Sequence, residues 1–112
     1  MSRTRLILAA VAAAFATSAL AAGDPAAGRQ TNFQCMGCHG IPGWKTAFPE
    51  VYSVPKLGGQ HAAYLVTALK QYKSGERDHA TMRSIAAGLS EKDMEDLAAY
   101  YSQAGAPAAA GK

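Results

Sequence analysis

The residues with the clearest chemical meaning lie together in the segment Cys35-Met36-Gly37-Cys38-His39. Two thiols separated by two residues, with a histidine directly after the second, form the attachment pattern of c-type haem. The spacing allows both sulfurs to form thioethers to the vinyl groups on one edge of the porphyrin, and the adjacent imidazole then binds the iron. We therefore predict one haem c, bound covalently through Cys35 and Cys38, with His39 as an axial ligand.

Three other kinds of site use the same residue types. A thioredoxin-like dithiol expects a strand before the first cysteine, and no strand pattern precedes Cys35. A zinc site would combine the three side chains with a fourth ligand, for which His61 and His79 are available. A simple disulfide between Cys35 and Cys38 would connect no distant parts of the fold. The histidine that directly follows Cys38, together with the missing strand, favours haem over all three.

The opposite face of the iron needs a second ligand or stays open, and methionine is the usual partner in electron-carrying cytochromes. Met36 lies inside the attachment segment, and Met94 falls on an apolar helical stripe. Met82 precedes the last predicted helix and is far enough along the chain to reach the other face of the ring. His79 and His61 are alternative ligands, and Met82 as a simple core residue is the remaining interpretation.

Helical patterns surround the motif. Asp24 and Pro25 are typical of a helix start, and helix-compatible residues continue to Gln34, just before the first cysteine. Residues 40–59 contain seven glycines and prolines, which predict a long loop that must pack on something. Residues 60–74 place apolar side chains at helical spacing and are followed by Gly75, which predicts a second helix with a glycine stop.

The C-terminal part predicts two further helical segments. Residues 82–87 are compatible with a short helical turn. Ser90, with Asp93 three residues later, resembles a capping box at the start of a last helix, which Gly105 closes. One face of that helix is apolar and consists of Met94, Leu97, Ala98 and Tyr101. Because the sequence has no alternating strand pattern and no repeat, the predicted fold class is all-α.

The first residues predict export. Arg3 and Arg5 precede an uncharged, alanine-rich stretch, and the residues Ala19-Leu20-Ala21 fit a small-x-small cleavage site. An uncleaved membrane anchor is the competing interpretation, but the stretch is marginal for a bilayer core, which needs about 20 strongly apolar residues. We therefore expect cleavage after Ala21, no transmembrane segment in the mature chain, and a location in the bacterial periplasm.

This cleavage divides the 112-residue chain into three parts. They are a signal peptide over residues 1–21, one domain over residues 22–105 and a flexible tail over residues 106–112. The formal charge of +3 falls to about +1 when the two leader arginines are removed. So small a charge, without a dense run of lysine or arginine, gives no support for nucleic-acid binding.

Taken together, the motifs resemble class I c-type cytochromes, particularly the small bacterial monohaem kind that is similar to one half of the dihaem c-four type. The resemblance spans residues 24–102, nearly the whole of the predicted domain. The matching stretches are Gly28, Phe33, residues 35–40, residues 55–65, residues 74–77, Met82, residues 89–90 and residues 97–101.

The resemblance implies a fold of about four helices wrapped round one covalently bound haem, with the first and last helices crossing at Gly28. It also implies that Met82 is the axial methionine and that the carbonyl of Pro55 accepts a hydrogen bond from the His39 imidazole. Such a bond would orient the ring and adjust its basicity. Residues 41–54 depart from the family because this segment is longer than expected.

The longer segment carries three aromatic residues, Trp44, Phe48 and Tyr52. Covering the edge of the haem is their simpler role, since large aromatic side chains mostly supply burial. The alternative role is to dock a partner protein or to tune the properties of the haem.

An iron with both axial positions filled has no open site for a substrate. The chemistry left is a one-electron Fe(III)/Fe(II) cycle, so we expect an electron carrier for redox partner proteins and not an enzyme. The alternative is a haem sensor or a peroxidase-like protein with a labile sixth ligand. Six basic side chains either steer an acidic partner or form an ordinary solvated surface: Lys45, Lys56, Lys70, Lys73, Arg77 and Arg83.

Overall fold

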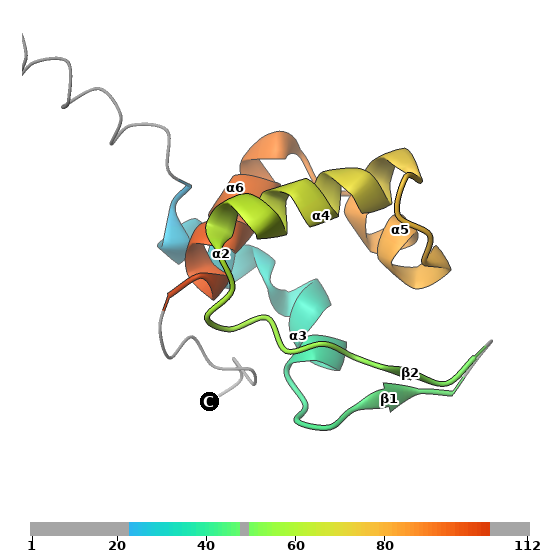
Figure 1. Cartoon of the computed structure of the whole chain (residues 1–112). Coiled ribbons are helices and arrows are strands. Elements are labelled where there is room, and N and C mark those ends of the chain that lie inside the picture. The colour runs from blue at the N-terminus through green and yellow to red at the C-terminus, as the bar shows by residue number, and fades with distance from the viewer. Residues whose placement is uncertain (1–22, 48–49, 104–112) are drawn as a thin grey trace, which may run out of the picture.

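The computed structural model describes residues 23–47 and 50–103. Within them the chain forms five helices and one short hairpin (Figure 1). The elements are α2 (Pro25–Thr31), α3 (Phe33–His39), β1 (Lys45–Thr46), β2 (Tyr52–Ser53), α4 (Ala62–Ser74), α5 (Ala80–Ala87) and α6 (Glu91–Tyr101). The described part is therefore mostly helical, as predicted. The hairpin is an addition to the prediction, because the sequence showed no strand pattern.

Some predictions fall outside the described residues. They concern the signal peptide over residues 1–21, the tail over residues 106–112, Phe48 and the helix stop at Gly105. The last helix itself ends earlier than predicted, at Tyr101. In the part of the chain that the structure describes, no helix is long and apolar enough to cross a membrane.

The first predicted helix is divided into two. Asp24 begins α2 as expected, because its side chain accepts the backbone N–H of Ala26, and Pro25 is the first helical residue. Asn32 interrupts the helix, and its side chain is buried. The carbonyl oxygen of Asn32 accepts the N–H groups of both Cys35 and Met36, so the chain enters a new helix at this point. Helix α3 then carries the complete motif.

Local signals set the boundaries of the later helices. Gly75 adopts φ +82° and ends α4, a conformation that glycine reaches without a Cβ penalty. The capping box predicted at Ser90 and Asp93 is present, with both reciprocal hydrogen bonds formed. Helix α5 begins at Ala80, two residues before the predicted start, because His79 caps it.

Helices α2 and α6 cross closely at Gly28. A Cβ atom at this position would lie 2.0 Å from the carbonyl oxygen of Asp96 and 2.9 Å from the Cβ of Tyr100. No side chain fits between the two backbones, so the crossing requires glycine. The expected contact between the first and last helices at Gly28 is therefore confirmed.

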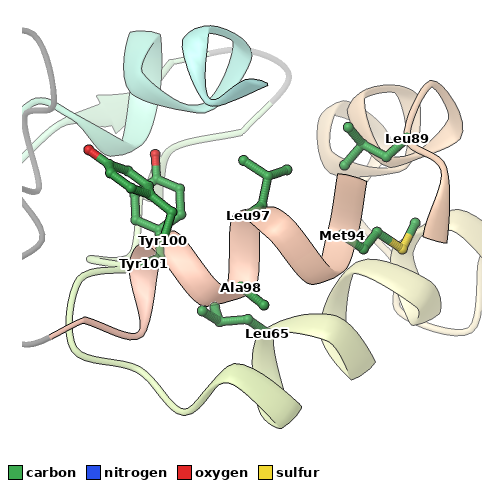
Figure 2. Packing of buried hydrophobic residues seen from close by; sticks show 7 residues of the cluster. All are labelled: Leu65, Leu89, Met94, Leu97, Ala98, Tyr100 and Tyr101. Atoms are coloured by element: carbon green, nitrogen blue, oxygen red, sulfur yellow. The ribbon is translucent and has the colours of Figure 1, made fainter. Parts of the chain in front are cut away.

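Helix α6 supplies most of the core. In Figure 2, Ala98 of α6 lies beside Leu65 of α4, whereas Leu97, Tyr100 and Tyr101 leave α6 on another side. The core cluster consists of Leu65, Leu89, Met94, Leu97, Ala98, Tyr100 and Tyr101. Four partly buried apolar residues pack against this cluster: Cys35, Leu57, Val66 and Leu69. The first cysteine of the motif is thus part of the border of the core.

Candidate functional site

Helix α3 places the two thiols and the imidazole of the motif on less than two turns of helix. Both cysteines are free and partly buried. Burial raises the pKa of the Cys35 thiol to about 11. Because a redox-active dithiol depends on a lowered thiol pKa, the surroundings of Cys35 oppose thiol-disulfide exchange. The thioredoxin-like interpretation therefore has no support from this site.

The His39 imidazole is held by the backbone of the long loop. Its Nδ1 lies 2.7 Å from the carbonyl oxygen of Pro55. A carbonyl oxygen only accepts hydrogen bonds, so Nδ1 carries the proton and donates it. In this tautomer Nε2 has its lone pair free, which is the form of imidazole that binds a metal. The contact expected from the family resemblance is thus present in the structure.

The alternative zinc site would need the cysteines, His39 and a later histidine to converge. Among the described residues, no three His, Cys, Asp or Glu side chains form a group suited to a metal ion. His61 is exposed at the start of α4, and His79 lies at the start of α5. The four-ligand set considered from the sequence is therefore not assembled.

Met82 occupies the first turn of α5 and is partly buried. Its backbone N–H donates to Nδ1 of His79 at 3.2 Å. The His79 ring also lies near the rings of Tyr52 and Tyr72, with centroid distances of 5.3 and 6.3 Å. Of the two rival ligands, His79 is thus engaged at one ring nitrogen and lies near two tyrosine rings. Met94 is 1% exposed inside the core, as its position on the apolar stripe predicted.

The elements that carry these residues do not pack extensively on one another. Helix α3 contacts α2, α5 contacts α4, and the strands of the hairpin contact each other. In Figure 1, α3 and the hairpin lie below α4, and α5 lies beside its C-terminal end. Leu57, Val66 and Leu69 are only partly buried on the border of the core, so their side chains could make further apolar contacts with a bound group.

A flat apolar ring attached at the two thiols fits this arrangement, because it would supply contacts that these elements do not make with one another. The donor set also fits: two thiols, an imidazole with a free Nε2 and a thioether are the groups that bind c-type haem. The fit rests on Cys35, Cys38, His39 and Met82, which all lie within the described residues.

Comparison with known proteins decides the family. The chain matches the cytochrome c family over residues 25–104. The chain belongs to the cytochrome c family. It is 44% identical over 84 residues to a cytochrome c-554(548) of Halomonas halodenitrificans, which covers 72% of this chain and 96% of that protein. A cytochrome c4 of Pseudomonas aeruginosa is 38% identical over 81 residues, covering 72% of this chain and 38% of the relative.

A solved structure agrees with this assignment. The crystal structure of reduced recombinant cytochrome c4 from Pseudomonas stutzeri has a TM-score of 0.53 and 35% identity to the chain. The match covers 72% of this chain and 50% of that one. The chain thus spans nearly all of the cytochrome c-554(548) but half or less of the cytochrome c4 proteins. This cytochrome c has the class I fold and carries haem c attached covalently through Cys35 and Cys38, and its family transfers electrons.

The described part of residues 41–54 of this cytochrome c contains the hairpin strands β1 and β2. The N–H of Val54 donates to the carbonyl of Trp44 at 2.9 Å, and Thr46 pairs with Tyr52 in the antiparallel register. Trp44 and Tyr52 are 43% and 49% exposed. The Tyr52 ring contacts His79, which the sequence did not indicate. A cavity of about 190 Å³ lies between the hairpin and the start of α5.

Three of the six basic side chains considered for partner steering have internal roles. Lys70 forms an ion pair with Glu91 at 2.9 Å. The Lys73 ammonium donates to the carbonyl oxygen of Leu89, and the Arg77 guanidinium lies over two tyrosine rings of α4. The other three are exposed and form no ion pair within the described residues: Lys45, Lys56 and Arg83.

Proposed function

We propose that this cytochrome c is an exported one-electron carrier, in which His39 and Met82 bind the haem iron from opposite faces. The single observation that carries the proposal is the hydrogen bond from His39 Nδ1 to the Pro55 carbonyl. It leaves Nε2 as the one imidazole nitrogen with a free lone pair. It also orients the ring through a backbone carbonyl oxygen. Unlike a carboxylate, this carbonyl does not gain or lose a proton as the pH changes.

The haem supplies an Fe(III)/Fe(II) couple, and the chain sets its properties. The Pro55 carbonyl accepts a hydrogen bond from Nδ1–H of His39. This bond makes Nε2 of the imidazole a stronger electron-pair donor to the iron. The thioether of Met82 is a softer ligand that favours Fe(II) and raises the potential. If His39 and Met82 both bind the iron, no position would be left for a substrate. This ligand set favours an electron carrier over a haem sensor or a peroxidase-like protein.

The proposed place of action is the bacterial periplasm. Its support is the leader pattern of Arg3, Arg5 and the Ala19-Leu20-Ala21 site, together with relatives from bacteria. The proposed partners are redox proteins that bind through a small transient interface. Lys45, Lys56 and Arg83 are the basic side chains free to attract an acidic surface on such a partner.

Binding of carbon monoxide to the reduced protein tests the carrier against the sensor or peroxidase. Carbon monoxide binds ferrous haem only at an open or weakly held axial position. We expect the spectrum of the ferrous protein to be unchanged under carbon monoxide, and a redox titration to fit a single one-electron step. Rapid formation of a carbon monoxide complex by the unmodified protein would favour the sensor or peroxidase instead.

The mass of the exported protein tests location and attachment together. Expressed in a bacterium that attaches haem c, the chain is expected in the periplasmic fraction, at the mass of residues 22–112 plus one haem. A red band that survives denaturing electrophoresis would show the covalent bond. A full-length chain retained in the cytoplasm would contradict the proposed export.

A further inference from the structure

We propose that His79 is a positioning residue for the sixth iron ligand. Its side chain caps α5 and holds the backbone of Met82, and Tyr52 of the hairpin and Tyr72 of α4 hold the His79 ring in turn. The inference rests on the proposed function, in which Met82 binds the iron. It assigns a structural role to Tyr52, which belongs to the segment of residues 41–54 and contacts the His79 ring.

The cap is defined by three backbone and side-chain features of His79. Its backbone is extended, with φ −167° and ψ 108°, and its carbonyl accepts the N–H of Arg83 at 2.8 Å. Its Nδ1 accepts the N–H of Met82, the third residue of the helix. The first N–H groups of a helix have no partner within it. His79 therefore supplies the acceptor that the Met82 backbone lacks.

Histidine is not among the residues that usually cap helices, which are serine, threonine, aspartate and asparagine. What histidine adds is a ring. Tyr52 lies at 59° and Tyr72 at 77° to that ring, so one side chain connects the hairpin, α4 and α5. Each tyrosine has a further partner of its own. The Tyr52 hydroxyl donates to Glu50 at 3.0 Å, and the Arg77 guanidinium lies 5.2 Å from the centroid of the Tyr72 ring.

Helix α5 has few other restraints. It has eight residues, and α4 is the one described element with which it packs extensively. A helix this short is marginal by itself, so its first turn depends on the cap and on the contacts of the capping residue. Met82 belongs to that first turn. Loss of the cap is therefore expected to increase the freedom of Met82 and to weaken its hold on the iron.

Exogenous imidazole measures this hold, because it competes with Met82 for the ferric iron. In the haem-loaded His79→Ala protein, we expect the apparent affinity for imidazole to rise about fivefold, which corresponds to the loss of a typical cap. The weak near-infrared band of methionine-ligated ferric haem is expected to persist but to titrate away at lower imidazole concentrations. In His79→Asn, whose amide oxygen restores a cap, the affinity is expected to return toward that of the unmodified protein.

Ser90→Ala is the matched control. It removes the cap of α6, which also bonds the third residue of a helix, but it leaves the start of α5 untouched. We expect its thermal stability to fall about as much as that of His79→Ala, while its imidazole affinity is unchanged. An equal rise of imidazole affinity in both variants would overturn the inference, because the effect would then reflect general destabilisation.

The remaining outcomes separate this inference from the proposed function. An unchanged imidazole affinity in His79→Ala, in a protein that retains the near-infrared band, would overturn the positioning role and leave the Met82 ligand standing. Failure of His79→Asn to restore the affinity would overturn the capping argument. Absence of the band from the unmodified protein would overturn the ligand assignment, and the inference with it.

Discussion

The carboxylate of Asp96 accepts a hydrogen bond from the backbone N–H of Asp24, 72 residues earlier in the chain, at 2.7 Å. Asp96 is 4% exposed, and the Lys92 ammonium donates to its other oxygen at 2.7 Å. The bond lies beside the crossing of α2 and α6, which Gly28 makes possible. Asp96 thus fixes the start of the helix that leads into the haem-binding motif.

Replacement of Asp96 by alanine leaves the Asp24 N–H without its acceptor in a partly buried place. We expect Asp96→Ala to lower the free energy of unfolding by about 1–3 kcal/mol, measured by chemical denaturation of the haem-loaded protein. Lys92→Ala is the control, because it removes only the exposed ion-pair partner, and its cost is expected to stay below about 1 kcal/mol. Equal costs for the two variants would contradict the role assigned to the backbone hydrogen bond.

The same carboxylate makes stability depend on pH. Hydrogen bonds from Lys92 and then from the Asp24 backbone lower the pKa of Asp96 below its ordinary value of 3.8. A carboxylate with a lowered folded-state pKa stabilises the fold above its unfolded pKa and loses this contribution as the pH falls through the folded one. The stability advantage of the protein over Asp96→Asn should therefore be constant near neutral pH and shrink below about pH 4. An advantage that grows on acidification would refute this assignment.

Gly28→Ala tests the helix crossing. The new Cβ would overlap the Asp96 backbone, so α2 and α6 must separate, and a cost of about 1–3 kcal/mol or more is expected from such overpacking. Gly88→Ala is a fair control, because its Cβ would lie 3.7 Å from the nearest atom, an ordinary contact, at φ −82°. Thermal unfolding followed by circular dichroism compares them. A Gly28→Ala protein as stable as Gly88→Ala would show that the helices do not need their close approach.

Removal of the haem is expected to unfold most of the chain. Helix α3, the hairpin and α5 have few contacts with one another, and a group that binds only the folded state stabilises it by the free energy of binding. The Cys35→Ala/Cys38→Ala double variant, freed of haem, should show low helix content and no cooperative thermal transition. Native helix content with a cooperative transition in this variant would disprove the dependence on haem.

The sequence predicted those features that depend on nearby residues. Asp24 with Pro25, Ser90 with Asp93, and Gly75 mark helix ends through contacts within a few positions, and each is found where it was expected. The cysteine pair is equally local, because Cys35 and Cys38 on one short segment define the covalent attachment of the haem. Contacts and spacings within a few residues were sufficient to predict these helix ends and the attachment site.

The features that the sequence did not predict depend on distant partners. The break at Asn32 accompanies a side chain that becomes buried only when the domain has folded. The hairpin depends on a hydrogen bond between Val54 and Trp44, in a stretch without alternation of apolar and polar residues. The cap on α5 uses His79, which no capping pattern includes, and its ring contacts join three elements.

Substitution of Met82 tests the central claim, that His39 and Met82 close both faces of the iron in an electron carrier. In Met82→Ala, the near-infrared band of the ferric protein should disappear, and the ferrous protein should gain the ability to bind carbon monoxide. His79→Ala should keep the band and remain closed to carbon monoxide. An unchanged spectrum in Met82→Ala, with an altered one in His79→Ala, would contradict the account and make His79 the ligand.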